Sequence, residues 1–318
     1  MTAWQNFAIR LARSDRVRKV VRPVVGRTVL ARRFIEYGSA ESAVAAARKL
    51  RDEHGITASL FYLGEYIDDP AVAEETVQAS CHVARLLDGA GLDAHVSVDP
   101  SAIGYLTSED LCRANATRIA EAVGAGSTGQ RRLMLDMEDL ALLDPTLDLF
   151  HYLGARGLSV GVTLQARLRR TAHDLAPLVE TATSVRLVKG AFPLGSEHDY
   201  QGRREIGQSF VALAATMLRP EAKEAGFYPA FATHDDVLAR EVMALAGANG
   251  WLPGEYEFEF LYRVRPKWQL ELRRQGHAVR VYLPFGTDWW PYVMRRIGEN
   301  PRNLLLVTRP LRERSARA

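Results

Sequence analysis

Three segments of the sequence carry polar side chains of the kind that bind ligands. The first, VRLVKGAF at 185–192, holds Arg186 and Lys189, followed by Gly190 and Ala191. The two cations suit an anion such as a phosphate or a reduced flavin ring. The small residues let a large ligand approach the backbone closely. The alternative is a barrel strand whose two cations pair with neighbouring carboxylates.

The second segment is FATHDD, residues 231–236. Thr233 and His234 end an apolar run, and Asp235 or Asp236 can cap the helix that follows. His234 suits contact with a ligand or a catalytic centre. A purely structural hydrogen bond is the equally weighted alternative.

The third segment is WWPYVMRRIGENP, residues 289–301, which we predict to be a helix. Four of its polar residues are spaced so that most share one helix face: Tyr292, Arg295, Arg296 and Glu299. Guanidinium groups bind planar carboxylates through paired hydrogen bonds, so the two arginines indicate a carboxylate clamp. A solvated Arg–Glu surface pair is the alternative.

Eight short apolar segments predict the strands that must position these residues: 56–63, 94–99, 132–138, 158–164, 184–190, 228–234, 256–262 and 278–284. Segments with helical apolar periodicity lie between them, including 68–91, 109–126, 165–182, 207–219 and 235–248. This alternation predicts an α/β fold, a distorted TIM-like (βα)₈ barrel over 55–318. A doubly wound open sheet is the alternative. Residues 1–54 predict an N-terminal helical arm, with its clearest helix at 39–54.

In such barrels the functional groups lie at the carboxyl ends of the strands. The polar residues that we assign to those ends are Asp99, Asp136, Glu138, Gln165, Arg186, Lys189, His234, Glu257, Glu259 and Tyr282. Each is either functional or a buried member of a satisfied polar network.

Composition narrows the class of protein. The 318 residues are 47% hydrophobic and 25% charged, with a net charge of +3, which gives no sign of nucleic-acid binding. Nine Lys and Arg residues lie within 1–33, where we expect solvated helices packed on the body; a transit peptide or a membrane-surface arm is the alternative. Neither a membrane span nor a secretory signal is expected. Cys81 and Cys112 fit a reducing cytoplasm, and no spacing indicates a metal site.

These motifs together resemble the monofunctional proline dehydrogenases, a family of FAD-dependent (βα)₈-barrel enzymes. The resemblance is carried by LARSDRVRK (11–19), YLGE (62–65), LMLDMED (133–139), VTLQARLRRT (162–171), VRLVKGAF, ATHD (232–235), YEFEFLYRVR (256–265) and VRVYLPFGTDWWPYVMRR (279–296). It implies that FAD lies at the strand ends of the domain 55–318. The matching cofactor positions are Gln165, Arg186, Val188, Lys189, Gly190, Ala191, Thr233 and His234.

The resemblance also implies a substrate site and a reaction. Arg295 and Arg296 would bind the substrate carboxylate, supported by Glu299. The walls would be Leu261, Tyr282 and Tyr292, and Asp136 would join an inner ion-pair network. A hydride would pass from the carbon beside the amine to the flavin, leaving an imine, with a quinone or oxygen as the final electron acceptor. No metal is required. The expected location is the cytoplasm, with peripheral contact to the inner membrane face left open.

The sequence departs from this family at Asp99, where the family reads Lys in V-S-x-K. At an effective dielectric constant of about 20, the reversed charge would disfavour a nearby substrate carboxylate by several kcal/mol. Asp99 instead suits an ammonium, hydrazine or hydroxyl group, so we expect a non-standard substrate that keeps its carboxylate. The alternatives are L-proline itself, oxidised to pyrroline-5-carboxylate, an N–N amino acid oxidised to a hydrazone, and a non-catalytic flavin-binding barrel.

Four further departures accompany Asp99: Arg167 and Phe192 where the family has Tyr, Glu259 where it has Gln, and Arg263 where it has Gly. We expect Arg167 and Arg263 to restore the positive charge that is lost at Asp99.

Overall fold

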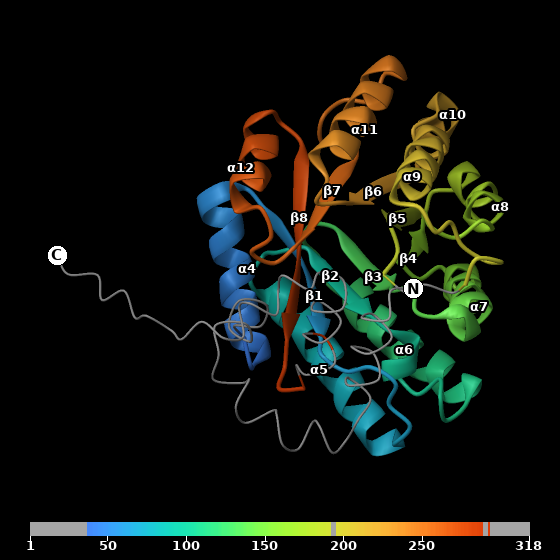
Figure 1. The fold of residues 1–318 in the computed structure, drawn as a ribbon. Helices are drawn as coiled ribbons and strands as arrows, with labels where there is room; N and C mark the ends of the chain where they lie inside the picture. Colours follow the sequence, from blue (N-terminus) through green and yellow to red (C-terminus); the bar gives the residue numbers. More distant parts are fainter. Residues whose placement is uncertain (1–36, 192–194, 289–291, 293–318) are drawn as a thin grey trace, which may run out of the picture.

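A closed barrel of eight parallel strands forms the centre of the molecule, with each strand paired to its neighbours in sequence order and β8 paired to β1 (Figure 1). This computed structural model describes residues 37–191, 195–288 and 292. The strands are β1 (Thr57–Tyr62), β2 (Ala94–Val98), β3 (Arg131–Leu135), β4 (Val160–Gln165), β5 (Ser184–Val188), β6 (Tyr228–Ala232), β7 (Glu257–Leu261) and β8 (Ala278–Phe285). The predicted (βα)₈ barrel is confirmed.

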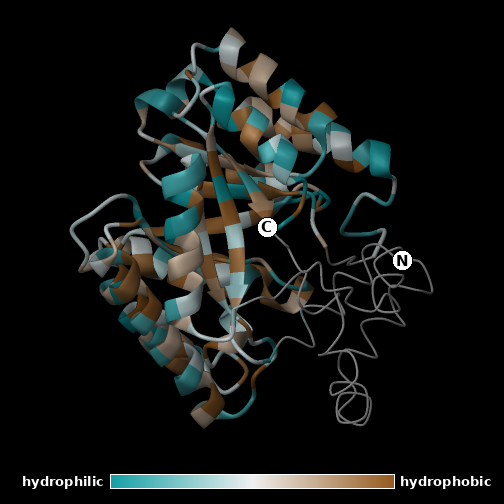
Figure 2. Ribbon diagram, turned by 90° about the vertical axis from the view of Figure 1, so that its left-hand side faces the viewer, coloured by the Kyte–Doolittle hydropathy of each residue, from teal (hydrophilic) through white to brown (hydrophobic). Residues whose placement is uncertain are grey.

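Helices surround the barrel and pack their apolar faces on it. They are α4 (Ala40–His54), α5 (Pro70–Gly89), α6 (Glu109–Gly124), α7 (Leu143–Ala155), α8 (Thr171–Leu175), α9 (Arg203–Met217), α10 (Pro220–Glu224), α11 (Asp236–Ala248) and α12 (Pro266–Arg274). Hydrophobic and hydrophilic residues alternate along these helices in Figure 2, as expected for helices with one buried face. The short 3₁₀ turns are η1 (Pro100–Ala102), η2 (Leu140–Leu142) and η3 (Leu178–Glu180).

Helix α4 confirms the helix predicted at 39–54. Ser39 caps its first turn by accepting a hydrogen bond from the backbone N–H of Ser42, and Gly55 ends it in the left-handed conformation with φ of 65°. Its buried face includes Ala43 and Ala47, and it contacts β1, β8 and α5. The arm boundary at residue 54 stays a prediction.

The continuous helix predicted over 165–182 is wrong. Gln165 is the last residue of β4, and only the short helix α8 and the turn η3 follow. The hydroxyl of Thr171 donates to the Gln165 carbonyl at 2.6 Å, which fixes a tight turn after the strand. Pro177 lacks a backbone N–H and so cannot donate a helical hydrogen bond to the carbonyl of His173, which ends the α-helical hydrogen bonding of α8 early.

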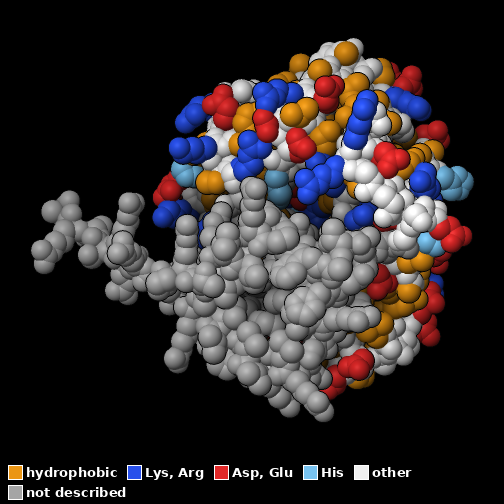
Figure 3. Space-filling view, viewed as in Figure 1, with side chains coloured by type: hydrophobic (Ala, Val, Ile, Leu, Met, Phe, Trp, Pro, Cys, Tyr) orange, Lys and Arg blue, Asp and Glu red, His pale blue; other side chains and the backbone are white. Residues whose placement is uncertain are grey.

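The surface of the described residues is mixed in charge. In Figure 3, Lys and Arg side chains are interspersed with Asp and Glu over the visible described face. None of the described helices has the length and apolar character needed to cross a membrane.

Candidate active site

A cavity of about 1110 Å³ opens at the carboxyl ends of the strands. Sites for a single small ligand usually measure roughly 300–1,000 Å³, so this cavity has room for a cofactor beside a substrate. The predicted residues that line it are Asp99, Asp136, Gln165, Arg167, Arg186, Val188, Lys189, Gly190, Ala191, Thr233, His234, Glu259, Leu261, Tyr282 and Tyr292. The predicted Arg295, Arg296 and Glu299 lie outside the described residues, as does Phe192.

Gly190 and Gln165 form one side of this cavity, where β4 and β5 end. Gly190 has φ of 98°, and a Cβ there would lie 2.6 Å from Oε1 of Gln165 and 2.7 Å from Cδ of Arg167. Only glycine suits this position. The amide of Gln165 donates to the Glu138 carbonyl at 3.0 Å, while its buried Oε1 has no partner among the described residues. That oxygen is therefore available to an N–H group of a ligand.

Two ion pairs fix the rim beyond β5 and β6. Nζ of Lys189 lies 2.8 Å from Oδ2 of Asp235, and this hydrogen bond lowers the pKa of Asp235. The other carboxylate oxygen of Asp235 accepts from the backbone N–H of Val237 and so caps α11. Arg265 donates to Asp236 at 2.9 Å and to the His234 carbonyl at 2.7 Å. Each of these rim cations is thus held in place by an aspartate.

The floor of the cavity is a buried network centred on Arg186. Its Nη1 lies 2.6 Å from Oδ1 of Asp136, and its Nε lies 2.8 Å from Oε2 of Glu259. The hydroxyl of Tyr282 donates to Oδ2 of Asp136 at 2.8 Å. Burial, reinforced by Asp136, raises the pKa of Tyr282 well above its usual value, so the hydroxyl keeps its proton. Burial also raises the pKa of Glu259 to about 7, although Arg186 opposes this.

A second network lies deeper in the barrel and corrects one expectation. Glu257 was expected at the carboxyl end of its strand, but it is the first residue of β7. It lies four positions before Leu261, about 13 Å along a strand, and it does not line the cavity. It accepts from Nε of Arg280 at 3.0 and 3.1 Å, and Arg280 also bonds Asp93 at 3.0 Å.

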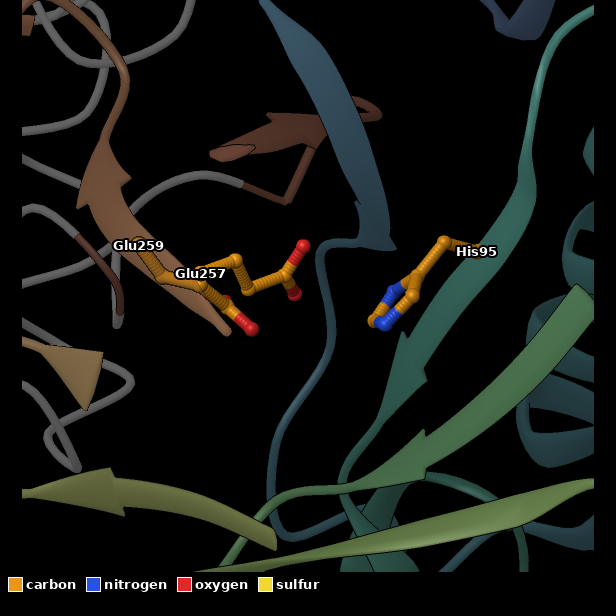
Figure 4. A group of neighbouring side chains, drawn as sticks. All are labelled: His95, Glu257 and Glu259. Atoms are coloured by element: carbon orange, nitrogen blue, oxygen red, sulfur yellow. The ribbon is translucent and has the colours of Figure 1, made fainter. Parts of the chain in front are cut away.

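His95, Glu257 and Glu259 lie between the two networks, with atoms of all three within 4.8 Å of one another (Figure 4). Nδ1 of His95 is 2.9 Å from the Ser59 hydroxyl. Burial, with Arg280 and Arg186 nearby, lowers the pKa of His95 and keeps it neutral. Because the guanidinium groups already hold both carboxylates and would repel a metal cation, this group is better suited to ion pairing than to metal binding.

Asp99 stands apart from both networks. It directly follows β2, is 3% exposed, and its Oδ2 has no hydrogen-bond partner among the described residues. Burial raises its pKa well above the usual value, and Glu138 and Asp136 raise it further. Of the two cations expected to compensate it, Arg167 pairs with the buried Asp199 at 2.9 Å and Arg263 lies over the Tyr262 ring. Neither forms an ion pair with Asp99.

Several cavity residues were not singled out from the sequence as site residues: Phe61, Met137, Thr163, Gln201, Arg203, Ile206, Phe260 and Arg265. Most are apolar or lie in connections without periodicity, where no sequence pattern marks them. Arg203 was the easiest of these to find from the sequence, because it is a basic residue at the start of α9, the helix that follows the Lys189 segment.

Comparison with known proteins supplies the context for this site. The family model described as proline dehydrogenase matches residues 43–309. A proline dehydrogenase of Deinococcus radiodurans is 36% identical over 284 residues, which cover 87% of this chain and 88% of that protein. Proline dehydrogenase 2 of Bacillus subtilis strain 168 is 30% identical over 302 residues, 94% of this chain and 96% of that protein.

Solved structures share the fold. A crystal structure of proline utilization A (PutA) from Bdellovibrio bacteriovorus superposes with a TM-score of 0.76 at 19% identity, over 97% of this chain. The match covers 39% of that protein, so this chain spans about two fifths of its length. At this identity the likeness concerns the barrel alone.

Proposed function

We propose a substrate and a cofactor for this chain, which belongs to the proline dehydrogenase family and is a flavin-dependent amino-acid dehydrogenase. The cofactor is FAD, and the substrate is a small amine that carries a carboxylate, with L-proline as the leading candidate. The observation that carries this proposal is the large cavity with the unpartnered Oε1 of Gln165 beside Gly190. The names of the relatives support L-proline.

The residues at the ends of β4, β5 and β6 fit a flavin. Oε1 of Gln165 would accept from an N–H of the ring system, and Gly190 leaves room for the ring to approach the backbone. Lys189 would face the anionic parts of the cofactor, bordered by Thr233 and His234. Bound FAD supplies a hydride acceptor.

The other side of the cavity would bind the amino acid. Arg295 and Arg296, supported by Glu299, would hold its carboxylate, and Leu261, Tyr282 and Tyr292 would wall its ring. Tyr282 is fixed by Asp136, so it offers a rigid surface. The substrate loses a hydride from the carbon beside its nitrogen, and the nitrogen lone pair forms the C=N bond of pyrroline-5-carboxylate.

A quinone or oxygen would then reoxidise the cofactor. The basic segment 1–33 offers a peripheral contact with an anionic inner membrane face, since clustered Lys and Arg bind such surfaces. Co-sedimentation with vesicles with and without anionic lipid tests this contact.

A second candidate is a non-standard substrate with an additional hydrogen-bonding group, such as a hydroxylated proline or a hydrazine-type amino acid. The observation that favours it is the buried Asp99 in the cavity, whose Oδ2 has no partner among the residues that the structure describes. A non-catalytic flavin-binding barrel is set aside, because the family is one of enzymes.

The deciding experiment mixes the purified, flavin-loaded protein with candidate amines in the absence of oxygen and follows the visible flavin absorbance. L-proline should bleach the flavin, and Arg295→Met should weaken its binding strongly. The matched control is Arg274→Met, because Arg274 is exposed on α12. Bleaching by a polar analogue but not by L-proline would favour the second candidate. Bound FAD that no amine bleaches would refute both.

A further inference from the structure

We propose that Asp99 accepts a proton from the ammonium group of the substrate, so that the amine is neutral when it is oxidised. This role rests on the proposed function, since it needs an amine substrate in the cavity. It assigns a proton-transfer step to a residue outside the Arg186 network.

Among the described residues, Asp99 is the cavity carboxyl that no cation pairs with. Asp136 is held by Arg186 and Tyr282, and Glu259 is held by Arg186. Glu138, behind the cavity wall, accepts from both the backbone N–H and the hydroxyl of Ser101. Oδ2 of Asp99 is buried without a partner among the described residues, and the residue lines the cavity. A ligand N–H would satisfy it.

The groups that face Asp99 are Glu138 and Asp136 beyond β3 and Tyr282 on β8. The charge of Arg186 is already shared by Asp136 and Glu259. Burial and the two acids raise the pKa of Asp99 well above its usual value, which favours the protonated carboxyl in the empty site. An arriving ammonium group stabilises the carboxylate instead, and one proton leaves to solvent when the substrate binds.

The proton transfer itself balances simply. One N–H bond of the ammonium group breaks, one O–H bond forms on Asp99, and the nitrogen regains its lone pair. The transfer replaces two buried charges by two neutral groups, which a desolvated cavity favours. The lone pair is what the nitrogen needs to form the C=N bond when the hydride leaves to the flavin, the oxidant of the reaction.

Calorimetry of the flavin-loaded enzyme tests the proton count directly. The probe is 1-aminocyclopentane-1-carboxylate, which lacks the hydrogen beside the amine and so binds without being oxidised. Titration at pH 7 in two buffers of different ionisation enthalpy should show about one proton released per site by the wild type and about none by Asp99→Asn. No release by the wild type, or equal release by both proteins, would overturn the role of Asp99.

The rate of flavin bleaching by the true substrate supplies a second readout. In Asp99→Asn the rate should follow the free-amine fraction and rise about tenfold per pH unit, converging with the wild type near the pKa of the amine. Asp110→Asn, on the exposed start of α6, is the matched control and should behave as wild type. Parallel pH profiles in Asp99→Asn and wild type would contradict the proposal.

The two proposals fail in different ways. Bleaching of the wild type without proton release overturns the role of Asp99 alone. A flavin that neither binds nor reacts with any amine overturns the proposed function and, with it, this role. The Asn variant should retain flavin and thermal stability, because it preserves the size of a side chain that has no ion pair with any described residue.

Discussion

Replacing Arg186 by Met should be the most damaging single change in the barrel floor. Its guanidinium is 3% exposed and lies 2.6 Å from Asp136 and 2.8 Å from Glu259. Methionine fills similar space but leaves both carboxyl groups without their cation. Removing one partner of a buried ion pair typically costs about 3–5 kcal/mol. At roughly 2 °C per kcal/mol for a large domain, the melting temperature should fall by about 6–10 °C.

The loss of stability in Arg186→Met should also depend on pH, and the protonation of Glu259 decides in which direction. Burial raises the pKa of Glu259 to about 7 even with Arg186 beside it, and removing the guanidinium raises that pKa further. A group whose pKa is higher in the folded state contributes its full stability below its unfolded pKa and loses it as the pH rises. Below about pH 7 Glu259 is protonated in both folded proteins, so the two stabilities change in parallel. The deficit of Arg186→Met relative to wild type should therefore grow as the pH rises above about 7.

Thermal and urea unfolding of the flavin-loaded proteins at pH 5, 6, 7 and 8 measures this deficit. The double variant Arg186→Met with Glu259→Gln should recover part of the loss, because one unpaired carboxyl is gone. Arg274→Met, exposed on α12, should change stability by less than about 0.5 kcal/mol. A deficit below about 1 kcal/mol, or one that is equal at all four pH values, would refute this account of the network.

Three further changes probe separate contacts. Gly190→Ala should reduce the ratio of bound FAD to protein, because its Cβ would lie 2.6 Å from Oε1 of Gln165 at φ of 98°; full flavin occupancy would contradict this. Glu259→Gln should flatten the fall in melting temperature that wild type shows as pH rises toward 7, since it removes a carboxyl whose pKa is raised to about 7; equal slopes would count against it. Lys189→Met should weaken FAD binding several-fold in fluorescence titration yet cost under about 1 kcal/mol of stability, because its pair with Asp235 is partly exposed.

The barrel was predictable because most strands are largely apolar segments that alternate with amphipathic helices. The ends of the strands were less predictable, since pairing rather than composition decides where the sheet stops. The strand predicted to run to 138 ends at Leu135, and the backbone N–H of Asp136 still bonds the Val98 carbonyl. Glu138 therefore lies on a connection, where Ser101 holds it.

The partners of the buried charges could not be predicted. Arg186 contacts Asp136 and Glu259 only because the barrel closes. In the sequence, Asp136 lies 50 positions and Glu259 lies 73 positions from Arg186. Sequence periodicity carries no information about such pairs. Arg167 does not compensate the charge of Asp99, for the same reason. It pairs instead with Asp199, a fully buried residue (0% exposed) on a connection that has no strand or helix pattern in the sequence.

The charges of the barrel interior explain how an acid at the end of β2 is compatible with an amino-acid substrate. Arg186 serves two acids and Arg280 serves two more, so neither has charge left for Asp99. A zwitterionic amino acid carries both a cation and an anion. Its ammonium group can pair with Asp99, while its carboxylate needs other cations. The predicted clamp of Arg295 and Arg296 would supply those cations. Asp99 would repel the substrate carboxylate only if the substrate bound in the opposite orientation. Asp99 would therefore favour the orientation in which the amine faces β2.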